Sequence, residues 1–466
     1  MLGHARAPRD LAFAGAEEYF DADWYLRTHP DVRDVDPWEH FVRSGDAERR
    51  SPGPGFDAEF YAGTYLALEE RHPLRHFLTH GRRAGHQPRP RPRTSDESRE
   101  AMAAILAEVE HPFLIVGNDA QRAGAPLLLL ELARHLRSRG WAPVFILLRG
   151  GPLLERFQAL GPTILVAEGH DVAGLGAALE PETPVVGNTG WAAPVLQQLG
   201  PAGPSLLLVH EMPDYLQEHG LLEPVAQAAT IVAALPAVTD LLRQRLPADT
   251  AVHTVLPGLL HSASSPEGVT RVGRVITEIL GADRLVFLGA GFADQRKGFD
   301  RFLELAQRIH ELETRSAFVW LGELGEWGRQ CAENARERGL PLLLPGFRLD
   351  ASAWYANADV YLLTSRQDPG PTTVMDAARC GVPFVAAPGD LGLQSLGDRL
   401  DGVGWFLTDE AEVPARAVEV ARSETQRSRS ERAHGIEAYA AFGGYVDDLL
   451  QLLRMRGLVD EPTPRS

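Results

Sequence analysis

Short apolar runs alternate with amphipathic stretches through most of this chain, from about residue 111 to residue 421. The runs are apolar at nearly every position, so both faces of each predicted strand are buried, as in parallel sheets covered by helices. Two such series follow one another, and a chain of 466 residues is too long for one core. We therefore predict an α/β protein with two doubly wound, Rossmann-like domains at residues 111–270 and 271–430.

Each predicted strand is an apolar run bounded by loop residues. In the first domain the strands are Phe113–Val116, Val144–Leu148, Ile164–Val166, Pro184–Val186, Leu206–Val209, Ile231–Ala234 and Val252–Leu256. In the second domain they are Leu285–Leu288, Phe318–Leu321, Leu342–Leu344, Val360–Leu363, Phe384–Ala386 and Trp405–Leu407, and a closing helix is expected within 431–456, at Tyr439–Met455. Two such domains facing each other place a cleft between the carboxyl ends of their sheets, where ligands of these folds bind.

The N-terminal part of the chain, residues 14–88, is an internal duplication. Phe20-Asp-Ala-Asp-Trp-Tyr25 returns as Phe56-Asp-Ala-Glu-Phe-Tyr61, and Gly45 returns as Gly81, at a constant offset of 36 residues. Each unit predicts two short helices and a Gly-containing exit. The repeated aromatic pairs favour the core of a small helical module, and a surface for a sugar or a protein partner is the alternative.

Residues 89–110 are predicted to form a linker and a leading helix. Alternating Pro and Arg in the linker favour an extended spacer, which is either solvated or in contact with an anionic lipid or polymer. A net charge of −17 argues against a nucleic-acid binder, and no run approaches the roughly 20 apolar residues of a membrane span. We expect a soluble, cytoplasmic protein, and peripheral contact with the inner face of the membrane stays open.

Two acids bracket a sharp turn between a predicted strand and a predicted helix. Asp368-Pro-Gly-Pro forces a turn at the carboxyl end of the strand, and the helix begins at about Thr372. Such a helix start binds phosphate through its dipole and its free N–H groups. Asp368 on the loop is placed to reach a sugar, and Asp376, one turn into the helix, is placed to bind two ribose hydroxyls. The alternatives are a turn acid at the first position and a solvated helix position at the second.

A second loop of the same kind is Gly289-Ala-Gly-Phe-Ala-Asp-Gln-Arg-Lys-Gly298, which also follows a strand and opens a helix. Its glycines permit close approach of the backbone. Arg296 and Lys297 add two positive charges just before the helix, which suits a diphosphate. The alternative is a solvated basic turn.

The first domain supplies two further candidates at strand ends. Gly124 lies in the loop Asn118–Ala125, between a strand and a helix, where it permits backbone to approach a ligand. His210-Glu211 follows the strand Leu206–Val209 directly, so the imidazole is either a structural group or a group that faces the cleft.

Together these motifs resemble the retaining GT-B glycosyltransferases of family four over most of residues 113–453. Lys297-Gly298 is similar to the family's Lys-Gly motif before a helix, and Asp368 to Asp376 is similar to its Glu-x7-Glu motif. The run at 377–386 looks like its Glu-Ala-Met-Ala-x-Gly-x-Pro-Val-Val. The N-terminal repeats resemble units fused to bacterial polysaccharide-biosynthesis glycosyltransferases.

The resemblance implies a role for each motif. Lys297, Asp368 and His210 would take part in catalysis, with Arg296 and Lys297 stabilising the leaving nucleoside diphosphate. Further contacts to the nucleotide-sugar donor would come from Gly124, Gly346, Phe347, Gly370, Pro371, Thr372, Thr373 and Asp376. No metal and no other cofactor is expected, because protein cations and helix dipoles would take the charge of the leaving group.

One departure bears on activity: both motif acids are Asp where the family usually has Glu, a loss of roughly 1.5 Å of reach. The leading hypothesis is a retaining glycosyltransferase that acts on a saccharide or lipid-linked acceptor in cell-surface polysaccharide or glycoconjugate assembly. The first alternative is a catalytically impaired GT-B subunit that binds a nucleotide, a sugar or a protein partner through its repeats. The second alternative is a nucleotide-sugar epimerase of the same fold.

Overall fold

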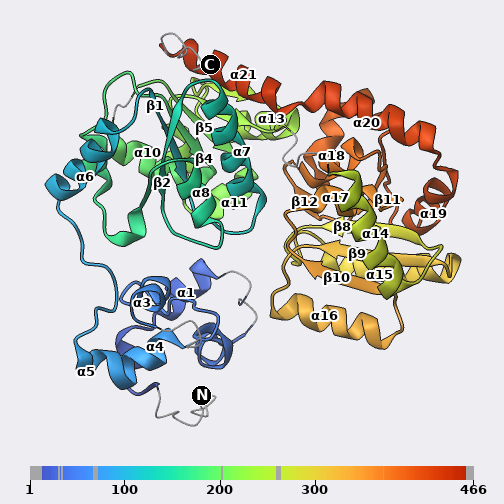
Figure 1. Ribbon diagram of the computed structural model, residues 1–466, viewed down its shortest axis with the longest axis horizontal. Helices are drawn as coiled ribbons and strands as arrows, with labels where there is room; N and C mark the ends of the chain where they lie inside the picture. The colour runs from blue at the N-terminus through green and yellow to red at the C-terminus, as the bar shows by residue number, and fades with distance from the viewer. Residues whose placement is uncertain are drawn as a thin grey trace.

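Two Rossmann-like domains lie side by side in the computed structural model, with a small helical module beneath the first of them (Figure 1). The structure describes residues 13–29, 32, 35–66, 72–200, 203–258, 264–370 and 372–457. Pro371, one of the predicted donor contacts, lies outside these residues. The predicted fold class is confirmed by the two parallel sheets and the helices on their faces.

The first sheet has seven parallel strands in the order β3-β2-β1-β4-β5-β6-β7. Its strands are β1 (Pro112–Gly117), β2 (Ala142–Leu147), β3 (Thr163–Leu165), β4 (Val185–Asn188), β5 (Ser205–Val209), β6 (Ile231–Ala233) and β7 (Val252–Thr254). The helices around it are α6 (Ser95–Ala107), α7 (Gly124–Ser138), α8 (Leu154–Leu160), α9 (Val172–Gly176), α10 (Ala193–Leu199), α11 (Pro213–Glu218), α12 (Leu222–Ala226) and α13 (Pro236–Arg245). The strand order reverses between β1 and β4, which is the switch point of a doubly wound sheet.

The second sheet has six parallel strands in the order β10-β9-β8-β11-β13-β15. They are β8 (Leu285–Ala290), β9 (Ser316–Leu321), β10 (Leu342–Gly346), β11 (Val360–Leu363), β13 (Phe384–Ala386) and β15 (Gly404–Phe406), beside a small pair of β12 (Gln367–Asp368) and β14 (Asp390–Leu391). The helices are α14 (Pro266–Leu280), α15 (Phe299–Leu312), α16 (Glu326–Glu337), α17 (Ala351–Ala356), α18 (Thr372–Arg379), the 3-10 helix η8 (Gly392–Leu400) and α19 (Val413–Ser423). Here the switch point lies between β8 and β11.

The C-terminal helices return the chain from the second domain to the first. The sequence predicts one helix beginning at Tyr439, but the structure has α20 (Gln426–Ala440) and a separate α21 (Phe442–Arg454). Between them Ala441 has an extended backbone with φ −59° and ψ 129°, which ends α20. α21 packs its apolar face against α7 and β5 of the first domain (Figure 1).

The duplicated module repeats one packing arrangement twice. Its helices include α1 (Ala22–Thr28), α2 (Pro37–His40), α3 (Ala58–Tyr65) and α4 (Pro73–His76), with a π-helical turn after α2 and after α4. Of the repeated aromatic pairs predicted to form the core, Tyr25 and Tyr61 are fully buried, whereas Trp24 and Phe60 are half-buried. A Cβ atom at Gly45 would lie 2.3 Å from the Tyr25 hydroxyl, and one at Gly81 would lie 1.9 Å from the Tyr61 hydroxyl. The repeated glycine therefore makes room for the repeated tyrosine.

The described residues include no helix that is long and apolar enough to cross a membrane. The Pro–Arg linker is held to the protein at several points: the Arg93 amide donates to Gly169 O at 2.7 Å, and Arg89 Nη1 donates to Pro54 O at 3.2 Å. Cys331 and Cys380 are half-buried free thiols.

Candidate functional site

The two predicted loops of the second domain meet because β8 and β11 are hydrogen-bonded neighbours. The loop after β8 carries Lys297, and the loop after β11 carries Asp368. Lys297 Nζ lies 2.5 Å from Asp368 Oδ2, so the switch point of the sheet is occupied by an ion pair. Neighbouring strand order, which the sequence does not display, is the reason that two motifs 71 residues apart come into contact.

Local backbone geometry fixes the position of Lys297. Gly298 has φ 69°, a left-handed conformation, and a Cβ there would lie 2.0 Å from Thr364 O at the end of β11. Only glycine fits, so the loop after β8 is tied to the adjacent strand end. The Lys297 amide donates to Asp294 Oδ1 at 2.6 Å, and its side chain passes over Gly291. Lys297 is also the only lysine in the sequence, and arginine stands at every other Lys or Arg position.

The Asp368 carboxylate is almost completely buried, with 2% of the residue exposed. Burial acts to raise its pKa, but the charges of Lys297 and Arg296 outweigh it, so the pKa lies below the usual range. Ser365 Oγ donates to Asp368 Oδ2 at 3.1 Å, and the Gly370 amide donates to Oδ1 at 3.3 Å. Asp368 is therefore an ionised group with its acceptors already in use, and it is more than a turn acid.

Arg296 is exposed, and its side chain forms no ion pair with the described residues. Its guanidinium donates one hydrogen bond, from Nη1 to Gln367 O at 3.3 Å. Arg366, by contrast, forms a two-pronged pair with Asp300 in the first turn of α15, at 2.8 Å for both contacts. Arg296 is thus placed to meet an anion, whereas Arg366 is a structural clamp between the two loops.

The structure separates Asp376 from the predicted phosphate contacts. Thr372 and Thr373 are half-buried at the start of α18, but Asp376, one turn later, has 0% of its surface exposed. Its interpretation as a solvated helix position is therefore wrong. The predicted ribose contact stays a prediction, and it would require movement of the groups that cover the carboxylate.

Tyr361 lies beneath this site and was not predicted from the sequence. Its hydroxyl is 2.9 Å from Thr373 Oγ1 and donates to Ala290 O at 3.4 Å, so it ties the start of α18 to the end of β8. Its pKa is raised by burial and by the charges of Asp368 and Asp376. The only sign of Tyr361 in the sequence is a hydroxyl-bearing residue within the apolar run Val360–Leu363.

The first domain presents His210 at the end of β5. Asn188 Nδ2, at the end of β4, donates to Ala125 O at 3.1 Å, which turns Asn188 Oδ1 towards His210 Nε2 at 2.8 Å. Nε2 therefore carries the proton, and Nδ1 is left as an acceptor. Burial lowers the pKa of His210 to about 4, so the imidazole is neutral near pH 7.

Glu211, the next residue after His210, binds backbone amides at the ends of β4 and β5. Its Oε2 accepts the Gly190 amide at 3.1 Å and the His210 amide at 3.0 Å. Burial raises the pKa of Glu211, and these amides oppose that rise. Asn188 and Glu211 hold His210 in place through these hydrogen bonds. Each stands at the carboxyl end of an apolar run, which is the signal that the sequence offers for them.

One contact joins the remaining predicted residues across the two domains. Gly124, at the start of α7, and Gly346, at the end of β10, both have open space where a Cβ would lie. Arg122, next to Gly124, pairs with Glu323 at 3.0 Å, and its guanidinium lies 5.8 Å from the centre of the Phe347 ring. The loop before α7 and the loop after β10 therefore meet at the boundary between the domains. Gly370 adds to it, because a Cβ there would lie 3.3 Å from Ala234 of the first domain.

The structure describes no group of three or more His, Cys, Asp or Glu side chains placed to hold a metal ion. The independence of metal stays a prediction.

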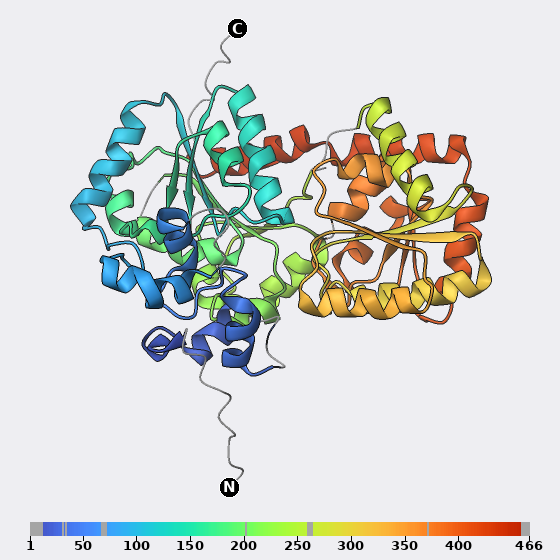
Figure 2. The ribbon, with the colours of Figure 1, turned by 60° about the horizontal axis from the view of Figure 1, so that its bottom comes forward.

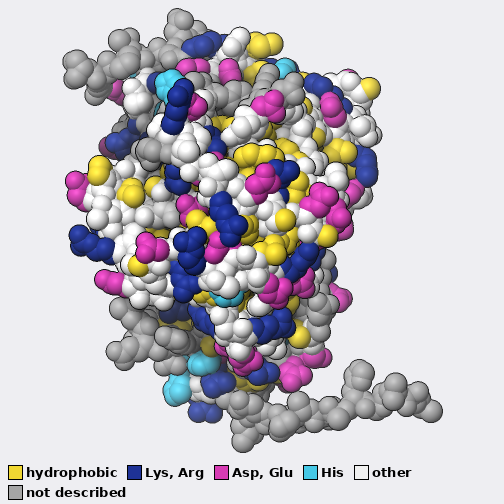
Figure 3. All heavy atoms as spheres, turned by 90° about the vertical axis from the view of Figure 1, so that its right-hand side faces the viewer, with side chains coloured by type: hydrophobic (Ala, Val, Ile, Leu, Met, Phe, Trp, Pro, Cys, Tyr) yellow, Lys and Arg dark blue, Asp and Glu magenta, His cyan; other side chains and the backbone are white. Residues whose placement is uncertain are grey.

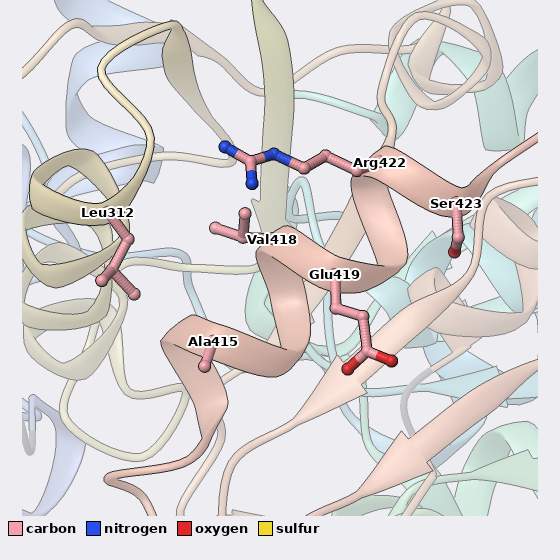
Figure 4. Close-up of a pocket in the computed structure, with 6 residues that line it drawn as sticks. All are labelled: Leu312, Ala415, Val418, Glu419, Arg422 and Ser423. Carbon is pink, nitrogen blue, oxygen red and sulfur yellow. The ribbon is translucent and has the colours of Figure 1, made fainter.

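A hollow of about 530 Å³ lies elsewhere, between α15 and α19 (Figure 4). It is open and is bordered by Leu312, Val418 and Arg422. Leu312 ends the helix that Lys297 precedes, so the hollow is roughly 20 Å from the ion pair. Arg422 is paired with Glu313 at 2.6 Å. Figure 3 shows the outer face of this domain, where apolar, basic and acidic side chains are interspersed, so no single-sign field marks it as a site.

Comparison with known proteins agrees with this arrangement. Residues 282–422, which hold the Lys297–Asp368 pair, match the family described as Glycosyl transferases group 1. A stretch of 166 residues is 26% identical to alpha-galactosylglucosyldiacylglycerol synthase from Streptococcus pneumoniae, covering 33% of this chain and 42% of the synthase. The chain thus spans less than half of that relative.

Solved structures extend the likeness over both Rossmann-like domains. HepE from Anabaena, in complex with UDP-glucose, has a TM-score of 0.62 at 17% identity and covers 74% of this chain and 100% of its own. Sucrose-phosphate synthase from Thermosynechococcus elongatus has a TM-score of 0.57 at 16% identity and covers 74% of this chain and 99% of its own. At these identities the likeness establishes the fold.

The fold and the site define a two-domain GT-B protein with a cationic, partly neutralised switch point in its second domain. That second domain is a group 1 glycosyltransferase domain, and the resemblance found in the sequence is confirmed at this level.

Proposed function

We propose that this protein transfers a sugar from a nucleotide-sugar donor to a saccharide or lipid-linked acceptor, with retention of configuration at the anomeric carbon. We further propose that it acts in the cytoplasm, in the assembly of a cell-surface polysaccharide or glycoconjugate. The observation that carries the proposal is the Lys297–Asp368 pair, with the exposed Arg296 beside it, at the switch point of a group 1 glycosyltransferase domain.

The chemistry of this site suits a leaving group that gains negative charge. As the bond between the sugar and the diphosphate breaks, the diphosphate takes the electron pair, and Lys297 and Arg296 would stabilise the resulting charge. The start of α18, at Thr372 and Thr373, is half-buried, and the first N–H groups of a helix would bind the same anion. His210, neutral and with Nδ1 left as an acceptor, would accept a hydrogen bond from a hydroxyl of the bound sugar.

Replacement of Lys297 by Ala tests the proposal. We expect turnover to fall at least about a hundredfold and nucleoside diphosphate binding to weaken, because a preorganised cation is lost. Lys297→Arg is the matched control, since it keeps the charge and should bind nucleotide more tightly than the Ala variant. Donor hydrolysis and transfer are measured with a panel of nucleotide sugars, and the anomer of the product is assigned by NMR. Normal turnover by Lys297→Ala would show that transfer does not need Lys297, and it would contradict the proposal.

One observation favours a second candidate, a GT-B subunit impaired in catalysis. Asp376 is fully covered, so it offers no ribose contact in this conformation, and both motif acids are short. Calorimetry with UDP, GDP and ADP separates the two: binding followed by turnover supports the transferase, whereas binding without hydrolysis or transfer supports the impaired subunit.

A further inference from the structure

Trp320 on β9 contacts the start of the loop that carries Lys297, residues 291–298, called the lysine loop below. The residue is 1% exposed and lies opposite Gly289 of β8 in the sheet register. Its indole Nε1 donates to Gly291 O at 2.9 Å. Figure 2 shows the second domain, on the right, with helices on both faces of this sheet. A buried indole usually finds an acceptor, and here the acceptor is the first residue of the lysine loop.

The same indole ring packs against the helix that ends the lysine loop. Phe299 and Phe302 of α15 approach Trp320 edge-on, with ring centres 5.0 and 5.1 Å away. Both phenylalanines have 0% of their surface exposed. Aromatic contacts of this geometry are favourable and orient the rings. One residue of a neighbouring strand therefore holds the lysine loop at its beginning and holds the helix that follows it.

The Gly291 peptide group is held by three contacts. Its N–H donates to Leu321 O at 2.8 Å, and its carbonyl accepts the Trp320 N–H. Gly322 packs so closely against this carbonyl that a Cβ there would lie 1.9 Å from Gly291 O. Gly291 itself has φ 141°, a conformation that side chains other than glycine rarely adopt. The lysine loop therefore starts from a fixed point on β9.

The side chain of Lys297 rests on Gly291. A Cβ built on Gly291 would lie 3.2 Å from Lys297 Cγ, 3.3 Å from Cδ and 3.5 Å from Cε. Beyond this contact, Nζ lies 2.5 Å from Asp368 Oδ2. A lysine has a long, flexible stem, so a fixed surface beneath the stem limits the positions that the amine reaches. Through Gly291, Trp320 constrains the amine without touching it.

A second buried donor holds the neighbouring carbonyl. Tyr361 lies on β11, on the other side of β8, and its hydroxyl donates to Ala290 O at 3.4 Å. Ala290 and Gly291 are consecutive, so both strands beside β8 anchor the point at which the chain leaves the sheet. The longer distance indicates a weaker hydrogen bond than that of Trp320.

We propose that Trp320 is a positioning residue for Lys297, which it holds in place for the leaving diphosphate by anchoring the lysine loop, with Tyr361 as a weaker second anchor. This rests on the proposed transfer function and deepens it, because it assigns a part in the reaction to a residue of the sheet interior. Charge stabilisation depends on a cation that is already in place, and a misplacement of about 1 Å can cost about a hundredfold in rate. A residue that only filled space would leave the amine unaffected.

The sequence makes the amine directly observable. Lys297 is the only lysine, so protein labelled with ¹³C at lysine Cε gives a single lysine signal in NMR. Trp320→Phe keeps an aromatic ring and removes the N–H donor. Phe318→Leu is the matched control, because Phe318 lies on the same strand and is equally buried, and its ring centre is 6.4 Å from that of Phe302. It removes core volume without removing a hydrogen bond.

We expect Trp320→Phe to move the Lys297 signal towards that of free lysine and to reduce its change on addition of UDP. We expect kcat per folded protein to fall about ten- to a hundredfold, with KM for the donor within about threefold of wild type. Tyr361→Phe should act in the same direction by a smaller factor, and it decides the question if Trp320→Phe does not fold. Phe318→Leu should keep the wild-type signal and a kcat within about twofold.

Three results would overturn the proposal: a wild-type Lys297 signal in Trp320→Phe, an equal displacement in Phe318→Leu, or a displaced signal with unchanged kcat. Thermal unfolding of each variant gives the folded fraction at the assay temperature. If the wild type transfers and hydrolyses no nucleotide sugar of a panel, the transfer function fails. The Lys297 signal then still decides whether Trp320 fixes the amine.

Discussion

Replacing Lys297 by Ala removes the cation beside a carboxylate that has almost no access to water. Loss of one partner from a fully buried ion pair costs about 3–5 kcal/mol. Here the Lys297 side chain keeps 19% exposure, and Ser365 and Gly370 still donate to Asp368. We therefore expect a smaller loss, about 2–3 kcal/mol, which lowers the melting temperature of a domain of this size by about 5–10 °C.

The pH dependence of this loss identifies its cause. In the wild type the pKa of Asp368 is lowered, so its stabilisation is present above the unfolded pKa of about 4 and is lost as the pH falls through the folded value. Without Lys297, burial is the dominant effect and we expect the folded pKa to lie above the unfolded one. The contribution of Asp368 to the stability of the variant is then fully present below the unfolded pKa of about 4 and is lost as the pH rises through the folded pKa. The deficit relative to wild type is therefore larger at pH 7.5 than at pH 4.5.

The double variant Lys297→Ala/Asp368→Asn completes the thermodynamic cycle. Asn has no charge to bury, so the double variant should melt at a higher temperature than Lys297→Ala at pH 7.5 and show no extra deficit on going from pH 4.5 to 7.5. Scanning calorimetry or dye-based thermal unfolding measures all four proteins at both pH values. If the double variant is no more stable than Lys297→Ala at pH 7.5, the buried carboxylate does not depend on Lys297 and the reasoning is refuted.

Three further predictions concern local geometry. Gly298→Ala should destabilise the second domain by about 2 kcal/mol or more, because it combines left-handed strain with a clash at Thr364 O; an unchanged melting temperature would contradict this. With a pKa of about 4, His210 should stay neutral from pH 5.5 to 8, and an NMR titration midpoint near 6.5 would disprove the buried, Asn-bonded imidazole. Gly81→Ala should displace the Tyr61 hydroxyl and lower the stability of the repeat module by about 1–3 kcal/mol, measured by hydrogen exchange in that module.

The strands were predictable because both faces of a parallel strand are buried, which leaves contiguous apolar runs such as Leu206–Val209 in the sequence. The candidate loops were predictable because they stand at the carboxyl ends of those runs. The order of strands in the sheet was not, so the contact between Lys297 and Asp368 followed only from the pairing of β8 with β11. The repeat module lies beside the loop after β2, where a Cβ at Gly150 would be 4.0 Å from Glu59 Oε2, and a periodic pattern does not encode such a contact.

The burial of Asp376 was missed for a different reason. α18 packs against α17 and against α20, a helix more than forty residues further along the chain, so a position that the sequence leaves free to face solvent is covered. Helical spacing identifies a face but not the distant element that covers it.

The two acids of the motif have different environments in this chain: Asp368 is paired with Lys297, whereas Asp376 is covered within α18. The Asp368 carboxylate forms an ion pair with Lys297 and partly neutralises its charge. The exposed Arg296 is therefore the more accessible cation for an incoming diphosphate. A diphosphate that engages Lys297 has to compete with a carboxylate only 2.5 Å away, so part of its binding energy offsets the weakening of that pair. Under the proposed function, the attraction between Lys297 and the leaving group grows as negative charge accumulates there, so we expect Lys297 to stabilise the transition state more than the ground state. Lys297→Ala should then lower kcat by a larger factor than it raises the dissociation constant of the nucleoside diphosphate, and equal factors would show that the lysine acts in binding alone.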